Sequence, residues 1–513
     1  MPNTQTDSLF LMVRSLTRAE KRHFKLYAAR NQSTEDAKFI RLFEVLDTIK
    51  EYNEETVLKK VKTIKPAQLA NVKAHLYGQL LVSLRLLHSS KNTDTQIREQ
   101  IDFAKILYNR GLVLQSLKIL DKAKTLATGN SHYILVLEIL QFEKAIESQH
   151  ITRSIKGRAD DLVEQTQYIL NQVSEVSRLS NISLLMYGLY LDNGHIRNEN
   201  DSKETEKFFK EKLGNIQERQ VSFFGKAYLH QAYCWYYFIQ LDFARYYRHA
   251  DKWVNLFSDN DQTIRQEPFL YLKGMHNLLN ALFMTGMQAR MIEELEKLEK
   301  FYQYSIVINE NLHTQAFVYL YTAKLNQHFL EGTFKEGLAI IPGIERKLVH
   351  HTNYIDIHRV MIFYYKIACL YFGAGDNEKA IVYLHKIISL KVGNLRSDIQ
   401  CFARLLHLIA HYELGNTTIL EYLIKSVYRF LSKMEYLDAV QNEIFKFLRR
   451  SLSSRQQDIR KNFIDLRDRL EKVASNKYAR RSYQYLDIVS WLESKIEKKP
   501  VEEIIQKKFK QRG

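Results

Sequence analysis

Apolar residues recur at every third or fourth position along most of the chain from Thr6 onward, and short polar segments separate one apolar stretch from the next. This spacing places the apolar side chains on one face of an α-helix, because a helix turns once in about 3.6 residues. In the N-terminal part it predicts helices at about 36–50, 54–62 and 66–89. After residue 432 it predicts three more, at about 434–451, 454–474 and 481–498.

Local signals at the helix ends agree with this pattern. Thr17 and Glu20 have the spacing of a capping box, in which each side chain bonds the other residue's backbone amide, so a helix is expected to begin there. Pro66 is placed in the first turn of its helix, where no amide hydrogen is needed. Pro500 is expected to end the last helix, after which Lys507 to Arg512 finish the chain as a basic tail.

The chain has only 18 glycines and 5 prolines among 513 residues. A fold with many tight hairpin turns would need more of both, whereas long helices with short connections need few. The composition therefore favours an all-α protein.

A spacing of mostly small or apolar residues recurs around five glycines. Such residues stand seven and four positions before each glycine and five, nine and twelve positions after it. The glycines are Gly111, Gly286, Gly332, Gly375 and Gly415, and the last four are 46, 43 and 40 residues apart. The gap of 175 residues between the first two is close to four such intervals, so further turns are expected near Gln149, Gly194 and Leu241.

This pattern resembles the tetratricopeptide-like helical-repeat superfamily, in which two antiparallel helices join at a glycine that tolerates a positive φ. The resemblance implies a right-handed α-solenoid with about eight helical hairpins over 96–432. A helical region at 1–90 would precede the array, and a helical cap with a basic tail would follow at 433–513. The repeats of about 40–46 residues are longer than the usual 34 of the family.

The net charge of +17 is concentrated at the two ends of the chain. Residues 441–513 hold 19 Lys and Arg against 10 Asp and Glu, and Arg14, Arg18, Lys21, Arg22 and Lys25 cluster near the N-terminus. Basic surface of this kind attracts nucleic acid, anionic lipid or acidic protein. The alternative is a solvated helical surface, because acidic residues are interspersed among the basic ones.

No sequence feature indicates chemistry, export or a membrane span. Cys234, Cys369 and Cys401 lie far apart in apolar stretches, without disulfide or zinc-ligand spacing, and read as reduced thiols. No secretory signal or apolar run of about 20 residues is present, so a cytoplasmic location is expected. No phosphate-binding glycine loop, dinucleotide fingerprint, nucleophile motif or metal-binding histidine pair is found. We therefore expect a non-enzymatic protein without a metal or cofactor.

The repeat register gives a candidate binding surface. The resemblance implies that the first helix of each hairpin lines a concave groove, with residues thirteen, ten, nine, six and three positions before the glycine facing it. Asn280 and Asn326 then hold equivalent positions in consecutive repeats, where their amides could bond an extended peptide. The alternative is that they lie on an ordinary polar helix face. The candidate groove residues are Lys273, Asn277, Asn280, Tyr319, Asn326, Phe329, Tyr365 and Tyr412.

These observations favour a non-enzymatic scaffold that binds a protein or peptide in the concave face of its repeats. The alternative is a nucleic-acid-associated regulator that uses its basic ends while the repeats sense a ligand. A dense aromatic segment, with 13 aromatic residues from Phe223 to Phe257, could stack on bases or on a peptide, but its helical spacing favours core packing. The sequence leaves the partner and the oligomeric state open.

Overall fold

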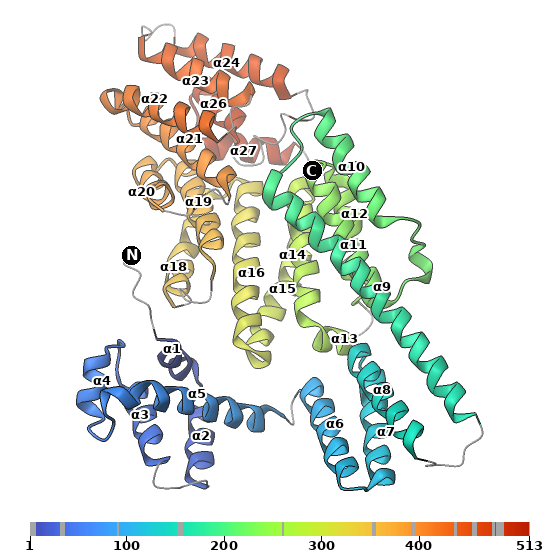
Figure 1. Ribbon diagram of the computed structural model, residues 1–513. Coiled ribbons are helices and arrows are strands. Elements are labelled where there is room, and N and C mark those ends of the chain that lie inside the picture. Colours follow the sequence, from blue (N-terminus) through green and yellow to red (C-terminus); the bar gives the residue numbers. More distant parts are fainter. Residues whose placement is uncertain are drawn as a thin grey trace. The chain divides into compact units, whose positions relative to one another are not determined.

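Every regular element of the described chain is a helix, as the composition predicted (Figure 1). The computed structural model describes residues 7–30, 36–89, 92–150, 157–258, 261–350, 355–390, 396–434, 439–453, 459–474 and 487–511, together with Gly393 and Tyr478. The chain divides into two compact units, Met1–Val173 and Ser174–Gly513, and the division falls within one long helix, α9 (Arg158–Asn193). None of the helices described is long and apolar enough to cross a lipid bilayer.

The first unit begins with five helices around their own apolar core. They are α1 (Ser8–Ser15), α2 (Arg18–Arg30), α3 (Asp36–Thr48), α4 (Glu54–Lys60) and α5 (Pro66–His88). The helices predicted at 36–50, 54–62 and 66–89 are confirmed as α3, α4 and α5. Leu42, Phe43 and Leu76 are among the side chains that this core buries completely, which explains why apolar residues recur at helical spacing in this segment.

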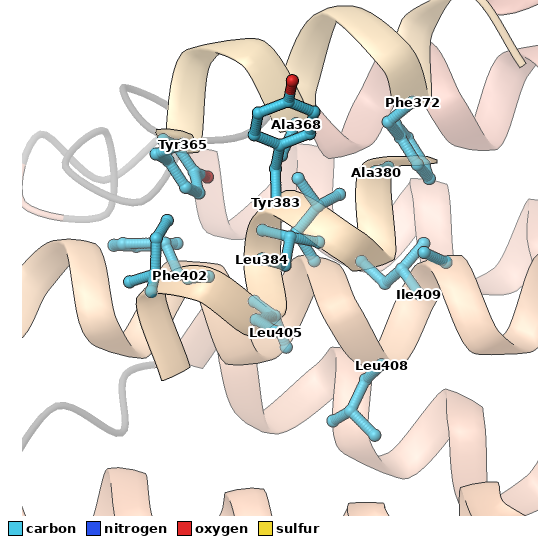
Figure 2. Close-up of a cluster of buried hydrophobic side chains, with 14 of the residues drawn as sticks. Tyr365, Ala368, Phe372, Ala380, Tyr383, Leu384, Phe402, Leu405, Leu408 and Ile409 are labelled. Atoms are coloured by element: carbon cyan, nitrogen blue, oxygen red, sulfur yellow. The ribbon is translucent and has the colours of Figure 1, made fainter. Parts of the chain in front are cut away.

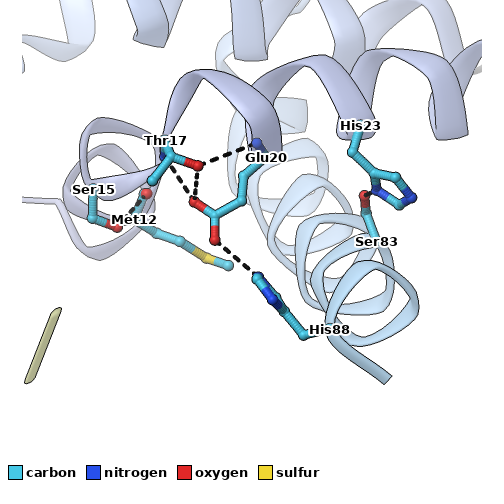
Figure 3. A network of polar contacts seen from close by, with 7 residues as sticks. All are labelled: Met12, Ser15, Thr17, Glu20, His23, Ser83 and His88. Atoms are coloured by element: carbon cyan, nitrogen blue, oxygen red, sulfur yellow. Dashed lines mark hydrogen bonds and ion pairs between the residues drawn. The ribbon is translucent and has the colours of Figure 1, made fainter. Parts of the chain in front are cut away.

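The predicted capping box is present at the start of α2 (Figure 3). The Thr17 hydroxyl accepts from the Glu20 amide at 3.3 Å, and the Glu20 carboxylate accepts from the Thr17 amide at 2.7 Å. The second Glu20 oxygen lies 3.0 Å from Nε2 of His88, at the end of α5. One glutamate therefore caps α2 and also ties it to α5.

The first unit continues with α6 (Thr93–Asn109), α7 (Val113–Gly129), α8 (Tyr133–Gln149) and the first part of α9. Gly111 forms the turn between α6 and α7, with φ of 77°. Ser116 is buried at the helix crossing, and its hydroxyl donates to the carbonyl of Ala104 at 2.8 Å. This small polar side chain therefore has a hydrogen-bond partner where the two helices approach each other.

The second unit holds the remaining helices. They are α10 (Glu199–Leu213), α11 (Phe223–Ile239), α12 (Phe243–Asn255), α13 (Asp261–Gln266), α14 (Pro268–Thr285), α15 (Gln288–Ile308), α16 (Glu310–Glu331), α17 (Phe334–Gly337), α18 (Ile341–His350), α19 (Ile357–Gly373), α20 (Asn377–Ile388), α21 (Ser397–Glu413), α22 (Thr417–Lys433), α23 (Ala439–Ser453), α24 (Ile459–Ala474), α26 (Ile488–Glu497) and α27 (Val501–Lys510). Short 3₁₀ turns occur at Glu218–Gln220 and Leu338–Ile340.

Helix ends coincide with the turns expected between Gly111 and Gly286. Helix α8 ends at Gln149, α9 ends before Gly194, and Leu241 adopts a positive φ of 57° between α11 and α12. Helix α9 itself continues for 36 residues without a break. The regular alternation of shorter helices is therefore interrupted between Arg158 and Asn193.

Four of the five positions counted from each glycine are buried, whereas the residue four before the turn is half-buried in every case except Leu282. All five glycines have positive φ and stand between two helices. In all five cases the residues seven positions before the turn glycine and five, nine and twelve positions after it are buried. Around Gly375 these positions are Ala368, Ala380, Leu384 and Ile387, each fully shielded from solvent, and Figure 2 shows the first three in one cluster with Phe402 and Leu405 of α21.

The C-terminal helices pack against the end of the last hairpin. Helices α23, α24 and α26 correspond to the three predicted segments, although residues 435–438, 454–458 and 481–486 of those predictions lie outside the described residues. Trp491 of α26 is buried, and its indole N–H donates to Glu413 Oε1 of α21 at 2.7 Å. The same glutamate also pairs with Lys495, which anchors α26 to the hairpin.

Residues after Pro500 form helix α27 rather than a tail. Ile504 is buried, and the Gln506 side chain donates to the carbonyl of Gly332 at 3.0 Å. Lys508 pairs with Glu493 at 2.6 Å. The basic residues from Lys507 to Arg512 predict a tail, but Ile504 and Ile505 give helix α27 a face that packs against the turn after α16.

We predict that Gly373→Ala destabilises the second unit. A Cβ at this position would lie 2.6 Å from the Phe334 ring of α17, so the ring or the helix must move, and such overpacking costs about 1–3 kcal/mol. Gly343→Ala is the matched control, because a Cβ there meets nothing within 4 Å and Ala favours a helix by up to about 1 kcal/mol. Urea unfolding followed by circular dichroism should show a lower midpoint for the first variant and an unchanged or higher one for the second.

Candidate functional site

Helices α14, α16 and α19 bring polar and aromatic side chains together on one side of three successive hairpins. Each is the first helix of its hairpin, so residues at equal distances from the turn glycine share an orientation. We call this surface the basic face. It comprises Lys273, His276 and Phe283 of α14, Tyr319, Asn326 and Phe329 of α16, and Arg359 and Lys366 of α19. All are half-buried except Asn326, which is buried.

The first half of the basic face is centred on a stacked pair of rings. The His276 and Tyr319 rings lie 4.0 Å apart and almost parallel, at 12°. The Arg359 guanidinium stands 5.6 Å from the centre of the Tyr319 ring, in cation–π geometry. A histidine, a tyrosine and an arginine from three helices therefore form one layer.

The electrostatics of this layer are dominated by positive charge. Burial, followed by the charges of Arg359, Lys273 and Lys366, lowers the pKa of His276 to about 3, so its imidazole is neutral near pH 7. Burial and the Arg359 charge also lower the pKa of Lys273. Three cations thus lie near one uncharged imidazole.

The second half of the basic face surrounds the Lys366 ammonium. Its Nζ donates to Asn326 Oδ1 at 2.5 Å and lies 5.3 Å from the centre of the Phe329 ring and 5.9 Å from that of Phe283. Burial, with a further contribution from Arg396, lowers the pKa of Lys366 to about 8. Lys366 as a whole residue is half-buried.

The two other predicted asparagines are held by a buried tyrosine of α12. Tyr246 donates its hydroxyl to Asn277 Oδ1 at 3.1 Å, and the Asn280 amide donates to the same hydroxyl at 3.3 Å. Asn277 is buried, and its amide also donates to the Lys273 carbonyl. Asn280 is half-buried, and no side chain of the described chain occupies its Oδ1.

Tyr365 and Tyr412 lie in different surroundings from the basic face. Tyr365 is buried in the core beside Phe402, where both are labelled in Figure 2. The Tyr412 ring packs in edge-on geometry against Phe447, Phe463 and Trp491 of the C-terminal helices. The structure therefore brings together Lys273, Tyr319, Asn326 and Phe329 among the predicted residues, and places these two tyrosines against other neighbours.

Sequence reasoning missed Arg359 and Lys366, which complete the face. Lys366 stands nine positions before Gly375, the same offset at which Asn277 and Ala323 precede their glycines. Applying the full set of offsets to the third hairpin would have found it. Arg359 lies sixteen positions before Gly375, one turn beyond the offsets considered, so its place depended on the length of α19.

A pocket of about 240 Å³ lies beside the start of α21. It is lined on one side by Tyr190, Asn193 and Arg197 from the end of α9 and the following loop, and on the other by Arg396, Asp398 and Lys433. Arg396 donates to both carboxylate oxygens of Asp398 through three contacts of 3.0, 3.2 and 2.9 Å. The Arg396 charge also contributes to lowering the pKa of Lys366.

The aromatic segment from Phe223 to Phe257 mainly packs within the protein. Tyr246, Trp253 and Phe257 are buried, and Tyr233 stacks on His249 with ring centres 4.3 Å apart. Within the described part of the chain, no three His, Cys, Asp or Glu side chains are grouped as metal ligands would be.

No protein-family model, curated protein or solved structure matches this chain. Its function therefore has to be inferred from its own residues.

We predict that His276 makes the protein sensitive to acid. Its pKa is about 3 in the folded state and near 6.5 when the chain unfolds, so the unfolded state binds the extra proton. The corresponding stability is present above pH 6.5 and is lost as pH falls toward 3. His276→Phe keeps a ring against Tyr319 and removes this proton linkage.

The measurement is the urea midpoint at pH 7.5 and at pH 5.0. The drop between the two should be smaller in His276→Phe than in the wild type, and His385→Phe, at an exposed position of α20, should show the wild-type drop. An equal drop in all three proteins would contradict the assignment.

Proposed function

We propose that this chain is a non-enzymatic binding protein, built as a right-handed α-solenoid of tetratricopeptide-like hairpins, whose basic face binds an extended segment of a protein partner. One observation carries the proposal. Lys273, Tyr319 and Lys366, which come from the first helices of three hairpins, lie on one surface together with their neighbours. Lys273 and Tyr319 hold equivalent positions, thirteen residues before their turn glycines, and Lys366 stands nine before its own, and all three are half-buried. Such a row can contact several residues of an extended peptide at once.

A polar group next to the basic face suits a peptide main chain. Asn280 stands on α14 between His276 and Phe283, and its amide oxygen, which no described side chain occupies, could accept a peptide N–H, whereas Asn326 uses its Oδ1 for Lys366. The stacked His276 and Tyr319 rings provide a flat apolar surface. An aromatic surface beside polar anchors is a common composition for protein-binding sites.

We predict that Tyr319→Ser abolishes or strongly weakens peptide capture. Random dodecapeptides displayed on phage would be selected on the full-length wild-type chain, and recovered peptides would be measured by fluorescence anisotropy. Removing an anchor ring at an interface costs about 2 kcal/mol or more, which is about thirtyfold in affinity. Asn280→Ala should weaken binding less, because it removes a single acceptor.

Tyr422→Ser is the matched control, since Tyr422 is 72% exposed on α22, the second helix of its hairpin. It should bind the peptides like the wild type. If the peptides bind Tyr319→Ser as tightly as the control, and both variants melt near the wild-type temperature, the basic face is not the peptide-binding site.

A second candidate function, nucleic-acid binding through the N-terminal helices, is favoured by one observation on α2. Arg18 and Arg22 are exposed one helical turn apart, and neither has an ion-pair partner among the described residues. By contrast, Arg450, Arg467 and Arg469 near the C-terminus all pair with carboxylates. The two arginines of α2 are therefore free to contact phosphates.

If this second function holds, Arg18→Gln/Arg22→Gln should weaken binding to a 20-base-pair DNA duplex without sequence preference. The slope of log affinity against log salt concentration should fall by about 2, because each phosphate contact contributes about 0.9. Lys118→Gln/Lys425→Gln changes the net charge equally at exposed positions elsewhere and should leave the slope unchanged. Absence of salt-dependent duplex binding by the wild type would reject this function.

A further inference from the structure

Two of the three cations of the basic face lack a carboxylate partner within the described part of the chain. Among the described residues, no carboxylate lies within ion-pair distance of Lys273 or Lys366. The polar contact of Lys366 is the neutral amide of Asn326. Arg359 pairs at 3.1 Å with Asp356, the exposed N-cap residue of α19.

Four other half-buried lysines of this chain are neutralised directly, whereas Lys347 contacts the Tyr302 hydroxyl and aromatic rings. Lys124 meets Glu143 at 2.6 Å, and Lys508 meets Glu493 at 2.6 Å. Lys73 and Lys495 likewise pair with Asp7 and Glu413. Taking an ammonium partly out of water is unfavourable unless an anion or several acceptors replace the water. The basic face therefore carries an electrostatic cost that this protein avoids at these four other sites.

Aromatic rings beside Lys366 favour one kind of anion. The Lys366 ammonium lies 5.9 Å from the centre of the Phe283 ring and 5.3 Å from that of Phe329, so a group that reaches it also meets apolar surface. A carboxylate on a flexible side chain suits this position, because the apolar part of that side chain can contact the two rings.

The pocket of about 240 Å³ carries charges of both signs, because Asp192 and Asp398 line it together with Arg396 and Lys433. Arg396 pairs with Asp398, whereas Lys433 has no ion-pair partner among the described residues. On the basic face itself, Lys273 and Lys366 stand on different helices. Two separate cations match a segment with several acidic residues better than one with a single carboxylate.

We propose that the segment bound by the basic face is acidic, with side-chain carboxylates placed at Lys366 and at the Lys273–Arg359 pair. This inference rests on the proposed peptide-binding function and specifies the chemistry of its ligand. The bound carboxylates replace water around the ammonium groups and supply charge-assisted hydrogen bonds, which are stronger than neutral ones. The stacked rings and Asn280 then contact the intervening residues of the segment.

The test uses the same displayed dodecapeptides, selected on the full-length wild-type protein. Recovered peptides should be enriched in Asp and Glu relative to the unselected library. One recovered peptide is then synthesised with an amidated C-terminus, both as selected and with each Asp and Glu replaced by Asn and Gln. The amide version should bind the wild type at least about tenfold more weakly, and this arm does not depend on the folding of any variant.

A second arm changes the protein. Lys273→Gln/Lys366→Gln should lower the affinity for the acidic peptide at least about tenfold. Lys118→Gln/Lys425→Gln alters the net charge equally at exposed positions and should bind the peptide like the wild type. Equal weakening by both pairs would mean that net charge alone attracts the peptide, and would overturn the proposal. A free C-terminal carboxylate that is needed for binding would also overturn it, because the acidic side chains would then not be the ligands.

The outcomes separate this inference from the proposed function. Recovered peptides that are neutral or basic, and that still lose binding in Tyr319→Ser, leave the peptide site in place and reject its acidic ligand. Failure to recover any peptide that distinguishes Tyr319→Ser from Tyr422→Ser rejects both. Full displacement of the acidic peptide by a 20-nucleotide oligothymidylate at equal charge concentration would assign the face to single-stranded nucleic acid instead.

Discussion

Close packing of two helices across a turn with positive φ determines how many of the helices in the Ser174–Gly513 unit are arranged. At Gly332, a glycine adopts φ of 69°, which a residue with a side chain adopts only at a cost. Small residues after the turn, such as Gly337 and Ala380, let the second helix approach the first, and a Cβ on Gly337 would already lie 2.9 Å from His328. Once this approach is fixed, the side of each first helix that faces away from its partner is fixed as well.

The basic face follows from that constraint. Because α14, α16 and α19 each begin their hairpin and keep similar registers, Lys273, Tyr319 and Lys366 come from distant parts of the sequence to one surface. Their environment is unfavourable for uncompensated charge, as the low pKa of Lys366, about 8, indicates. Proteins commonly retain such local costs where a ligand is bound, since the ligand offsets them.

The C-terminal helices decide where this surface stops. The register of the hairpins alone would continue the face along α21 to Tyr412. Instead, Phe447, Phe463 and Trp491 pack around the Tyr412 ring, and Glu413 holds α26 in place. Helix α27 then returns to the turn at Gly332, so the final helices connect the last hairpin with α16.

The sequence by itself determined the helices and the spacing of the hairpins. Apolar periodicity located α3, α4 and α5 to within a few residues, and counting from five glycines identified the buried positions around each turn, because local spacing dictates which side chains a helix turns inward. The sequence did not predict the docking of α27, because a charged segment of this kind is equally compatible with a tail. It also did not predict the length of α9, because an unbroken helix carries no local signal for where it ends. The partners of Asn277, Asn280 and Lys366 were decided only by tertiary structure, because each bond joins residues 31 to 40 positions apart on different helices.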